Sequence, residues 1–148
     1  MVMMKIYLAA PFFSPEQIDR LERVEEALAK NPTVTQVYSP RQHQESQAEQ
    51  FTPAWAAEIF KRDVGQVLDA DALVVVADFH DNDADSGTAF EQGLAWATKK
   101  PIVLFEETDY PTNLMLTESL TAFMKTSDAL MNYDFSQCPA LPYDGKIM

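Results

Sequence analysis

The sequence predicts a doubly wound α/β sandwich, in which helices cover both faces of a parallel sheet of about five strands. Short apolar runs alternate with longer segments of helical periodicity, which is the order of β-α units joined by right-handed crossovers. The run 72–77 is apolar at every position, as in a parallel strand that is covered on both sides. A length of 148 residues, of which 47% are hydrophobic, fits one domain spanning 1–148.

The N-terminal part of the chain predicts two strands with a helix between them. Residues 4–10 form a short buried strand, and a helix follows because Ser14 can cap it and Pro15 suits its first position. The dipeptide Asn31-Pro32 ends this helix. Residues 34–38 then alternate in polarity as a second strand.

The middle of the chain predicts a polar loop, two helices and the most apolar strand. Residues 41–50 have the length and polarity of a loop that covers a functional site. Thr52-Pro53 starts a helix whose apolar side chains recur at helical spacing up to Leu68, and the strand 72–77 follows it. Residues 86–98 form a helix that is apolar on nearly all sides, which predicts that the helix is largely buried.

The C-terminal third predicts one more strand and one more helix. Residues 101–105 form the strand, residues 117–124 form the helix, and a tail begins at Asn132. In such a sheet, ligands bind beyond the carboxyl ends of the strands. Polar side chains that follow a strand are therefore the first candidates for a site.

Composition excludes several classes of function. Twenty-three acidic side chains oppose 11 basic ones, for a net charge of −12, so the chain lacks the clustered cations that nucleic acid requires. Only four glycines are present, and their spacing fits neither the Rossmann fingerprint nor the P-loop. No apolar run approaches the ~20 residues that span a bilayer. We expect an uncharged or cationic ligand, no membrane association, and, since Cys138 is the single cysteine and no signal peptide is evident, a cytoplasmic location.

Two carboxylates and a phenol are the strongest catalytic candidates. Asp85 and Glu91 lie at the start of the helix 86–98, and Tyr7 lies near the exit of the first strand. Asp85 has an alternative interpretation as a plain N-cap, and Tyr7 as an ordinary core tyrosine. The six-residue spacing brings Asp85 and Glu91 together only if the helix begins at Thr88 or later. Paired carboxylates in an uncharged pocket suit chemistry at an acetal-like carbon, including an N-glycosidic bond.

Other polar groups give weaker signals. Asp63 follows Lys-Arg, where a surface ion pair is the ordinary explanation. No metal site is predicted, because His43 and His80 have no further ligand at a suitable spacing. An acidic loop also lacks the glycine and glutamate of an EF-hand. Its aspartates are Asp78, Asp81, Asp83 and Asp85.

Three motifs resemble those of the nucleoside 2-deoxyribosyltransferases, in the same order and over nearly the whole chain. They are Lys5-Ile-Tyr-Leu-Ala-Ala-Pro-Phe-Phe13, Asp85-x-Gly-x-x-x-Glu91-x-Gly93 and Thr112-Asn-Leu-Met115. The resemblance implies a flavodoxin-like sheet and transfer of 2-deoxyribose between nucleobases with retention of configuration. It also implies that no cofactor is needed and that the partners are 2′-deoxynucleosides and free nucleobases.

The resemblance also implies roles for individual residues. Glu91 resembles the nucleophile that forms a deoxyribosyl-enzyme ester, Tyr7 the phenol that orients it, and Asp85 the acid that protonates the leaving base. Asp63 and Gln44 resemble base-recognition residues, with Gln42 as an alternative to Gln44. The apolar wall of the pocket would include Phe13.

The end of the chain is implicated in assembly by the same resemblance. Asn113 and Met115 match a segment that reaches into a neighbouring subunit's site, which implies a homo-oligomer, either a dimer or a hexamer of dimers. Family members often end in an aromatic residue that closes the pocket, whereas this chain ends in Met148. Either Tyr143 or the terminal carboxylate of Met148 could take that place.

Two other functions compete with transfer. One is hydrolysis of 2-deoxynucleoside 5′-monophosphates, which calls for a phosphate site. The first loop, Ala10-Pro-Phe-Phe-Ser-Pro, lacks the Gly/Ser/Arg-rich composition of such a site. The other is a nucleoside-binding module without catalysis, since a fold does not fix a function.

Overall fold

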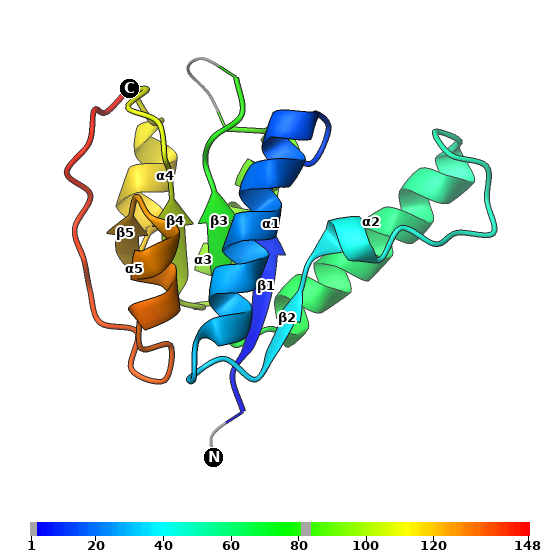
Figure 1. Cartoon of the computed structure of the whole chain (residues 1–148). Helices are drawn as coiled ribbons and strands as arrows, with labels where there is room; N and C mark the ends of the chain where they lie inside the picture. The colour runs from blue at the N-terminus through cyan, green and yellow to red at the C-terminus, as the bar shows by residue number, and fades with distance from the viewer. Residues whose placement is uncertain (1–2, 81–83) are drawn as a thin grey trace.

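Five parallel strands form the centre of the molecule in the order β2-β1-β3-β4-β5 (Figure 1). The computed structural model describes residues 3–80 and 84–148. This strand order is that of flavodoxin-like sheets, so the predicted doubly wound α/β fold is confirmed. The strands are β1 (Lys5–Ala9), β2 (Gln36–Tyr38), β3 (Ala72–Val76), β4 (Ile102–Phe105) and β5 (Ala122–Met124).

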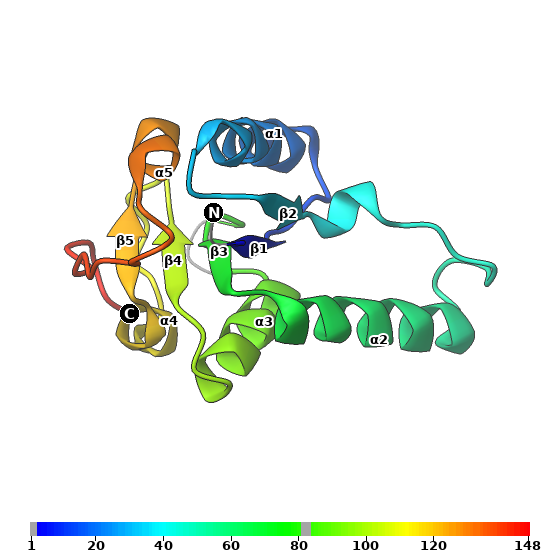
Figure 2. The same cartoon turned by 90° about the horizontal axis from the view of Figure 1, so that it is seen from below.

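Helices cover both faces of the sheet, as Figure 2 shows when the molecule is seen from below. One face carries α1 (Pro15–Lys30) and α5 (Ser127–Asn132). The other carries α2 (Pro53–Asp69), α3 (Ser86–Ala97) and α4 (Leu114–Ser119). Two apolar clusters fill the layers between helices and sheet, and the central strand β3 is buried at all five positions. Among the described residues, no helix is long and apolar enough to cross a membrane.

Local sequence signals explain where the first helices begin. The Ser14 side chain accepts a hydrogen bond from the amide of Gln17 at 3.2 Å, and Pro15 occupies the first turn of α1. Thr52 caps α2 in the same way, through the amide of Trp55 at 3.3 Å. A 3-10 turn, Pro40–Gln42, lies within the stretch between β2 and α2. In both views, α2 and that stretch extend past the β2 edge of the sheet (Figures 1 and 2).

The predicted helix 117–124 is wrong. Asn113 caps α4, which begins at Leu114 and ends at Ser119, and residues 122–124 form the edge strand β5 beside β4. A three-residue strand is too short to show a period, and its pairing with β4 decides its conformation. The C-terminal segment then runs along β5, where Phe123 donates its amide to the carbonyl of Leu141 at 2.9 Å (Figure 1).

The expectation that the helix 86–98 is largely buried is also wrong. Phe90 is 52% exposed and Trp96 is 63% exposed, and the buried residues of α3 are Thr88, Gln92 and Ala95. An apolar face of α3 therefore points to solvent in the single chain. Two aspartates of the predicted acidic loop, Asp81 and Asp83, lie outside the described residues.

Candidate active site

A cavity of about 840 Å³ opens beyond the carboxyl ends of β1, β2 and β3. Its position is the point where the strand order reverses, because the chain moves from β1 to β2 on one side and then to β3 on the other. Its volume suits a small organic ligand. The residues that line it and matter below are Phe13, Arg41, His43, Gln44, Phe51, Trp55, Phe60, Asp63, Asp85, Thr88, Phe90 and Glu91.

Glu91 and Tyr7 form the innermost pair of the site. Tyr7 is fully buried on β1, and its hydroxyl donates a short hydrogen bond to Oε2 of Glu91 on α3. Burial raises the pKa of Glu91 to about 8, and the negative charges of Asp63 and Asp85 add to this, although the Tyr7 hydrogen bond opposes it. Burial also raises the pKa of Tyr7, so the phenol stays a donor.

Asp85 serves as the N-cap of α3 and also lines the cavity. Its Oδ2 accepts hydrogen bonds from the amide of Thr88 at 3.0 Å and from the hydroxyl of Thr88 at 3.2 Å. Both bonds end on one oxygen, so capping does not occupy Oδ1. The N-cap and site interpretations of Asp85 are therefore compatible.

The spacing argument for Asp85 and Glu91 is wrong. The helix begins at Ser86, not at Thr88, yet both carboxylates line one cavity. The reason is that Asp85 has extended backbone angles, φ −60° and ψ 138°, and so its side chain does not follow the helical period that relates helix residues.

Asp63 of α2 faces the same cavity, and the alternative of a surface ion pair is not seen for it among residues 3–80 and 84–148. Its neighbour Arg62 pairs instead with Glu58 at 3.1 Å and donates to the carbonyl of His43 at 2.8 Å. Burial raises the pKa of Asp63 to about 6, and the nearby Arg62 and His43 limit the rise. Asp63 is thus a third carboxyl group in the cavity, able to accept or donate a hydrogen bond near neutral pH.

The two glutamines that compete for base recognition are placed differently. Gln44 lines the cavity, and its amide donates to the carbonyl of Arg41 at 2.7 Å. Gln42 ends the 3-10 turn and is absent from the cavity lining. Phe13 lines the cavity and is 65% exposed, at the position expected of an apolar wall.

Several aromatic residues of the site were not predicted. The His43 ring stacks on Tyr38 with centroids 4.4 Å apart, and Tyr38 stacks on Tyr7 at 5.8 Å, so a column of rings leads to the Glu91 contact. The sequence draws attention to His43 as a possible metal ligand and not as an aromatic ring of the site, although it follows β2 in the predicted covering loop. Trp55 and Phe60 belong to the apolar side chains at helical spacing in α2, and they line the cavity where α2 extends past the sheet.

Asn113 and Met115 are not brought to this cavity. Asn113 caps α4, accepting the Met115 amide at 2.8 Å, and Met115 is 71% exposed. The carbonyl of Met148 accepts the amide of Leu114 at 2.9 Å. The Tyr143 ring packs on Phe123, with centroids 4.6 Å apart. The end of the chain therefore flanks the Asn113 segment and does not close the chain's own cavity.

No metal ligand set is evident in residues 3–80 and 84–148, where no three His, Cys, Asp or Glu side chains are grouped to hold an ion. What the cavity offers is a desolvated carboxyl group held by a phenol, a second carboxyl group at a helix start, and aromatic walls. This combination can stabilise positive charge on a sugar ring, supply a nucleophilic oxygen, and stack a planar base.

Comparison with known proteins agrees with this chemistry. A family model described as nucleoside 2-deoxyribosyltransferase matches residues 6–136. A curated nucleoside deoxyribosyltransferase from Limosilactobacillus fermentum is 31% identical over 154 residues, which cover 94% of this chain and 90% of that protein.

Solved structures give the same result. The 2-deoxyribosyltransferase from Bacillus psychrosaccharolyticus is 37% identical with a TM-score of 0.85, over 94% of this chain and 98% of that one. A 2-desoxiribosyltransferase from Leishmania mexicana is 25% identical with a TM-score of 0.57, over 73% of this chain and 67% of that one. The chain therefore belongs to the nucleoside 2-deoxyribosyltransferase family, whose members transfer deoxyribose between nucleobases.

Proposed function

We propose that this enzyme exchanges the base of a 2′-deoxynucleoside for a free base through an ester between Glu91 and the sugar. The observation that carries the proposal is the contact in which the fully buried Tyr7 donates its hydroxyl to the half-buried Glu91. A carboxylate held by one oxygen on a phenol presents its other oxygen in a fixed direction. Fixed orientation of this kind is a large part of what an enzyme contributes to a displacement.

The reaction proceeds in two displacements at C1′ of the sugar. A carboxylate oxygen of Glu91 attacks C1′ while the bond to the base nitrogen breaks, and the base leaves with a proton from Asp85. The incoming base then attacks C1′, its proton passes to Asp85, and the ester bond to Glu91 breaks. Each displacement inverts C1′, so the product retains the configuration of the donor.

The raised pKa of Glu91 fits the proton requirement of the first step. Because Glu91 keeps its proton up to about pH 8, the site holds a transferable proton at neutral pH. Attack on C1′ requires ionised Glu91, so this proton must leave Glu91 before the first displacement. Once that proton is lost, the departing base has no acid to receive it from.

The charges of the cavity favour a nucleoside over a nucleotide. Three carboxyl groups, those of Asp63, Asp85 and Glu91, line it, and those that are ionised repel a phosphate. Arg41, the guanidinium in the lining, is paired with Glu25 at 3.0 Å. Asp63 and Gln44 provide hydrogen bonds for the base edge, and the aromatic walls stack its faces.

We further propose that the active form is a homo-oligomer, a dimer or a hexamer, in the cytoplasm. Asn113 and Met115 are exposed and lie away from their own cavity, which suits a segment that completes a neighbour's site. Large apolar side chains on α2, α3 and α4 are also exposed, as expected of surfaces that another subunit covers. They are Phe60, Phe90, Trp96, Leu114 and Met115.

Base exchange followed by chromatography tests the function. Deoxyinosine and adenine should give deoxyadenosine and hypoxanthine, and Glu91→Ala should lower the rate at least ~10³-fold because it removes the nucleophile. Glu26→Ala is the control, since Glu26 is exposed and, among the described residues, pairs only with Lys30. Donor without acceptor should also leave a sugar adduct on the Glu91 peptide, seen by mass spectrometry.

Each alternative function has its own outcome in this experiment. Base release that requires a 5′-phosphate and ignores the acceptor base would identify a hydrolase. Binding of deoxyinosine with no turnover and no adduct would identify a binding module. Equal activity of wild type and Glu91→Ala would refute the assigned nucleophile.

A further inference from the structure

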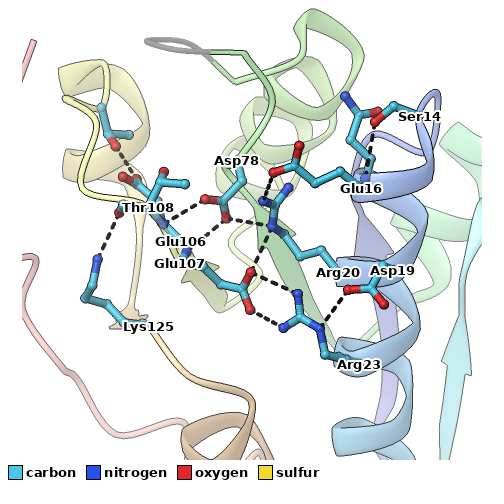
Figure 3. Close-up of polar contacts among 12 residues, drawn as sticks. Ser14, Glu16, Asp19, Arg20, Arg23, Asp78, Glu106, Glu107, Thr108 and Lys125 are labelled. Carbon is cyan, nitrogen blue, oxygen red and sulfur yellow. Dashed lines mark hydrogen bonds and ion pairs between the residues drawn. The ribbon is translucent and has the colours of Figure 1, made fainter.

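A second group of charged side chains lies at the carboxyl end of β3 and does not line the cavity (Figure 3). Asp78 is 4% exposed, and its two oxygens accept the backbone amides of Glu107 at 3.0 Å and Thr108 at 2.9 Å. Arg20 of α1, 6% exposed, lies 3.8 Å from Asp78 and donates to Glu107 at 3.0 Å. Asp78 therefore holds the backbone that leaves β4, and Arg20 holds the Glu107 side chain of the same segment.

The same segment is held again at its far end. Glu106 is 4% exposed and accepts a short hydrogen bond from the Thr112 hydroxyl. Thr112 pairs with the end of the chain, donating its amide to the carbonyl of Lys146 and accepting the amide of Met148, both at 2.9 Å. The next residue is Asn113. Residues 106–112 are therefore fixed at both ends, immediately before Asn113 and Met115.

Burying these charges needs an explanation beyond fold stability. A buried ion pair adds little to stability compared with apolar packing of the same volume, although losing one partner is costly. Asp78 directs both oxygens to loop amides, whereas an aspartate that only capped a helix would bond within its own helix. The contacts specify where one loop lies relative to α1 and β3.

We infer that Asp78, held by Arg20, is a positioning residue that sets the place of Asn113 and Met115 in the neighbouring subunit's active site. The inference rests on the proposed function, because it assigns these two residues to a neighbour's sugar site. In this arrangement, Asp78 of one subunit affects the active-site cavity of the neighbouring subunit and not its own. The covalent chemistry at Glu91 does not require Asp78.

Asp78→Asn is the first test. The asparagine has one acceptor oxygen, so its NH₂ group meets one of the two loop amides and that hydrogen bond is lost. Contacts to the sugar hydroxyl act on ground state and transition state alike, so we expect the donor KM to rise about tenfold with kcat changed less than about twofold. Thr112→Val removes the other anchor and should give the same pattern. Asp19→Asn is the matched control, because Asp19 is exposed and its side chain bonds only Arg23 within the part of the chain that the structure describes.

Mixed assemblies separate a positioning role from a structural one. The two variants, Asp78→Asn and Glu91→Ala, are co-expressed with different tags and purified through both tags. In the mixed assembly, the Asp78→Asn subunit supplies an intact Glu91, and its Glu91→Ala neighbour supplies an intact loop. The donor KM of these assemblies should return to the wild-type value. A defect confined to the fold of the Asp78→Asn subunit would not be corrected by its partner.

The outcomes distinguish this inference from the proposed function. Wild-type protein that does not exchange bases refutes the function itself. Active wild type with an unchanged KM in Asp78→Asn and Thr112→Val overturns the inference alone. So does a mixed assembly that keeps the raised KM. If Asp78→Asn does not fold, Thr112→Val carries both measurements.

Discussion

Replacing Glu91 with glutamine should make the enzyme inactive and, at alkaline pH, more stable. The native pKa of Glu91 is about 8, against the ordinary value of 4.5. Between these values the folded protein binds a proton that the unfolded chain has lost, so the free energy of unfolding falls as pH rises. The loss begins above the unfolded pKa of 4.5 and is complete above the folded pKa of about 8. Glutamine does not ionise, so the variant escapes this loss of stability at alkaline pH. The amide oxygen of glutamine can still accept the Tyr7 hydrogen bond.

The size of the effect follows from the pKa difference. Converted to free energy, the shift gives an upper limit of about 5 kcal/mol. The cavity is open to water, which screens the charge, so we expect about 2 kcal/mol. Urea unfolding at pH 5 and pH 9, at one protein concentration, measures it. Glu91→Gln should match wild type at pH 5 and exceed it at pH 9, and Glu26→Gln should show no such gain. An equal gap between wild type and Glu91→Gln at both pH values would refute the reasoning.

Four further changes test the site, and each has its own measurement. Tyr7→Phe removes a hydrogen bond that lowers the pKa of Glu91, so the alkaline fall of kcat/KM near pH 8 should move to higher pH, with a loss of about 10 to 100-fold in kcat/KM. Asp63→Asn removes a charge that raises this pKa, so the pH profile should move the opposite way. Asp85→Ser keeps a good N-cap, so urea unfolding should change by less than ~0.5 kcal/mol while kcat/KM falls ~10²–10⁴-fold. Trp96→Lys places a charge on the exposed face of α3, and light scattering should show a smaller assembly than wild type. A pH profile that moves in the same direction for Tyr7→Phe and Asp63→Asn would contradict the first two predictions. An assembly of unchanged size in Trp96→Lys would contradict the last.

The positions of the three proposed catalytic residues could be predicted because their signals are local. Tyr7 lies on an apolar run that can only be a buried strand, and Asp85 and Glu91 lie at the start of a helix that follows another such strand. Parallel topology then brings strand exits to one edge of the sheet, whatever the details of packing. The spacing alone suggested an ion pair for Asp63 and not a place in the cavity, because no local rule says which way a side chain of α2 faces.

The residues that were missed depend on how elements pack. Tyr38 stacks on Tyr7, and His43 on Tyr38, only because β2 lies beside β1 and the register pairs Tyr7 with Tyr38. Trp55 and Phe60 have the spacing of core residues, and only the extension of α2 past the sheet turns them toward a cavity. Periodicity reports which residues share a face, but it does not report what that face meets.

Helix α3 carries both the proposed nucleophile and part of the proposed subunit interface. Glu91 points into the cavity, whereas Phe90 is 52% exposed although it also borders the cavity, and Trp96 is 63% exposed. Adjacent helix residues point about 100° apart, so a helix that presents a nucleophile inward must present other residues outward. An exposed apolar side chain such as Trp96 gains nothing from contact with water, but it buries well against another subunit. A partner on this face would fix α3, and with it the contact between Glu91 and Tyr7, so loss of assembly should impair the chemical step even where no catalytic residue has changed.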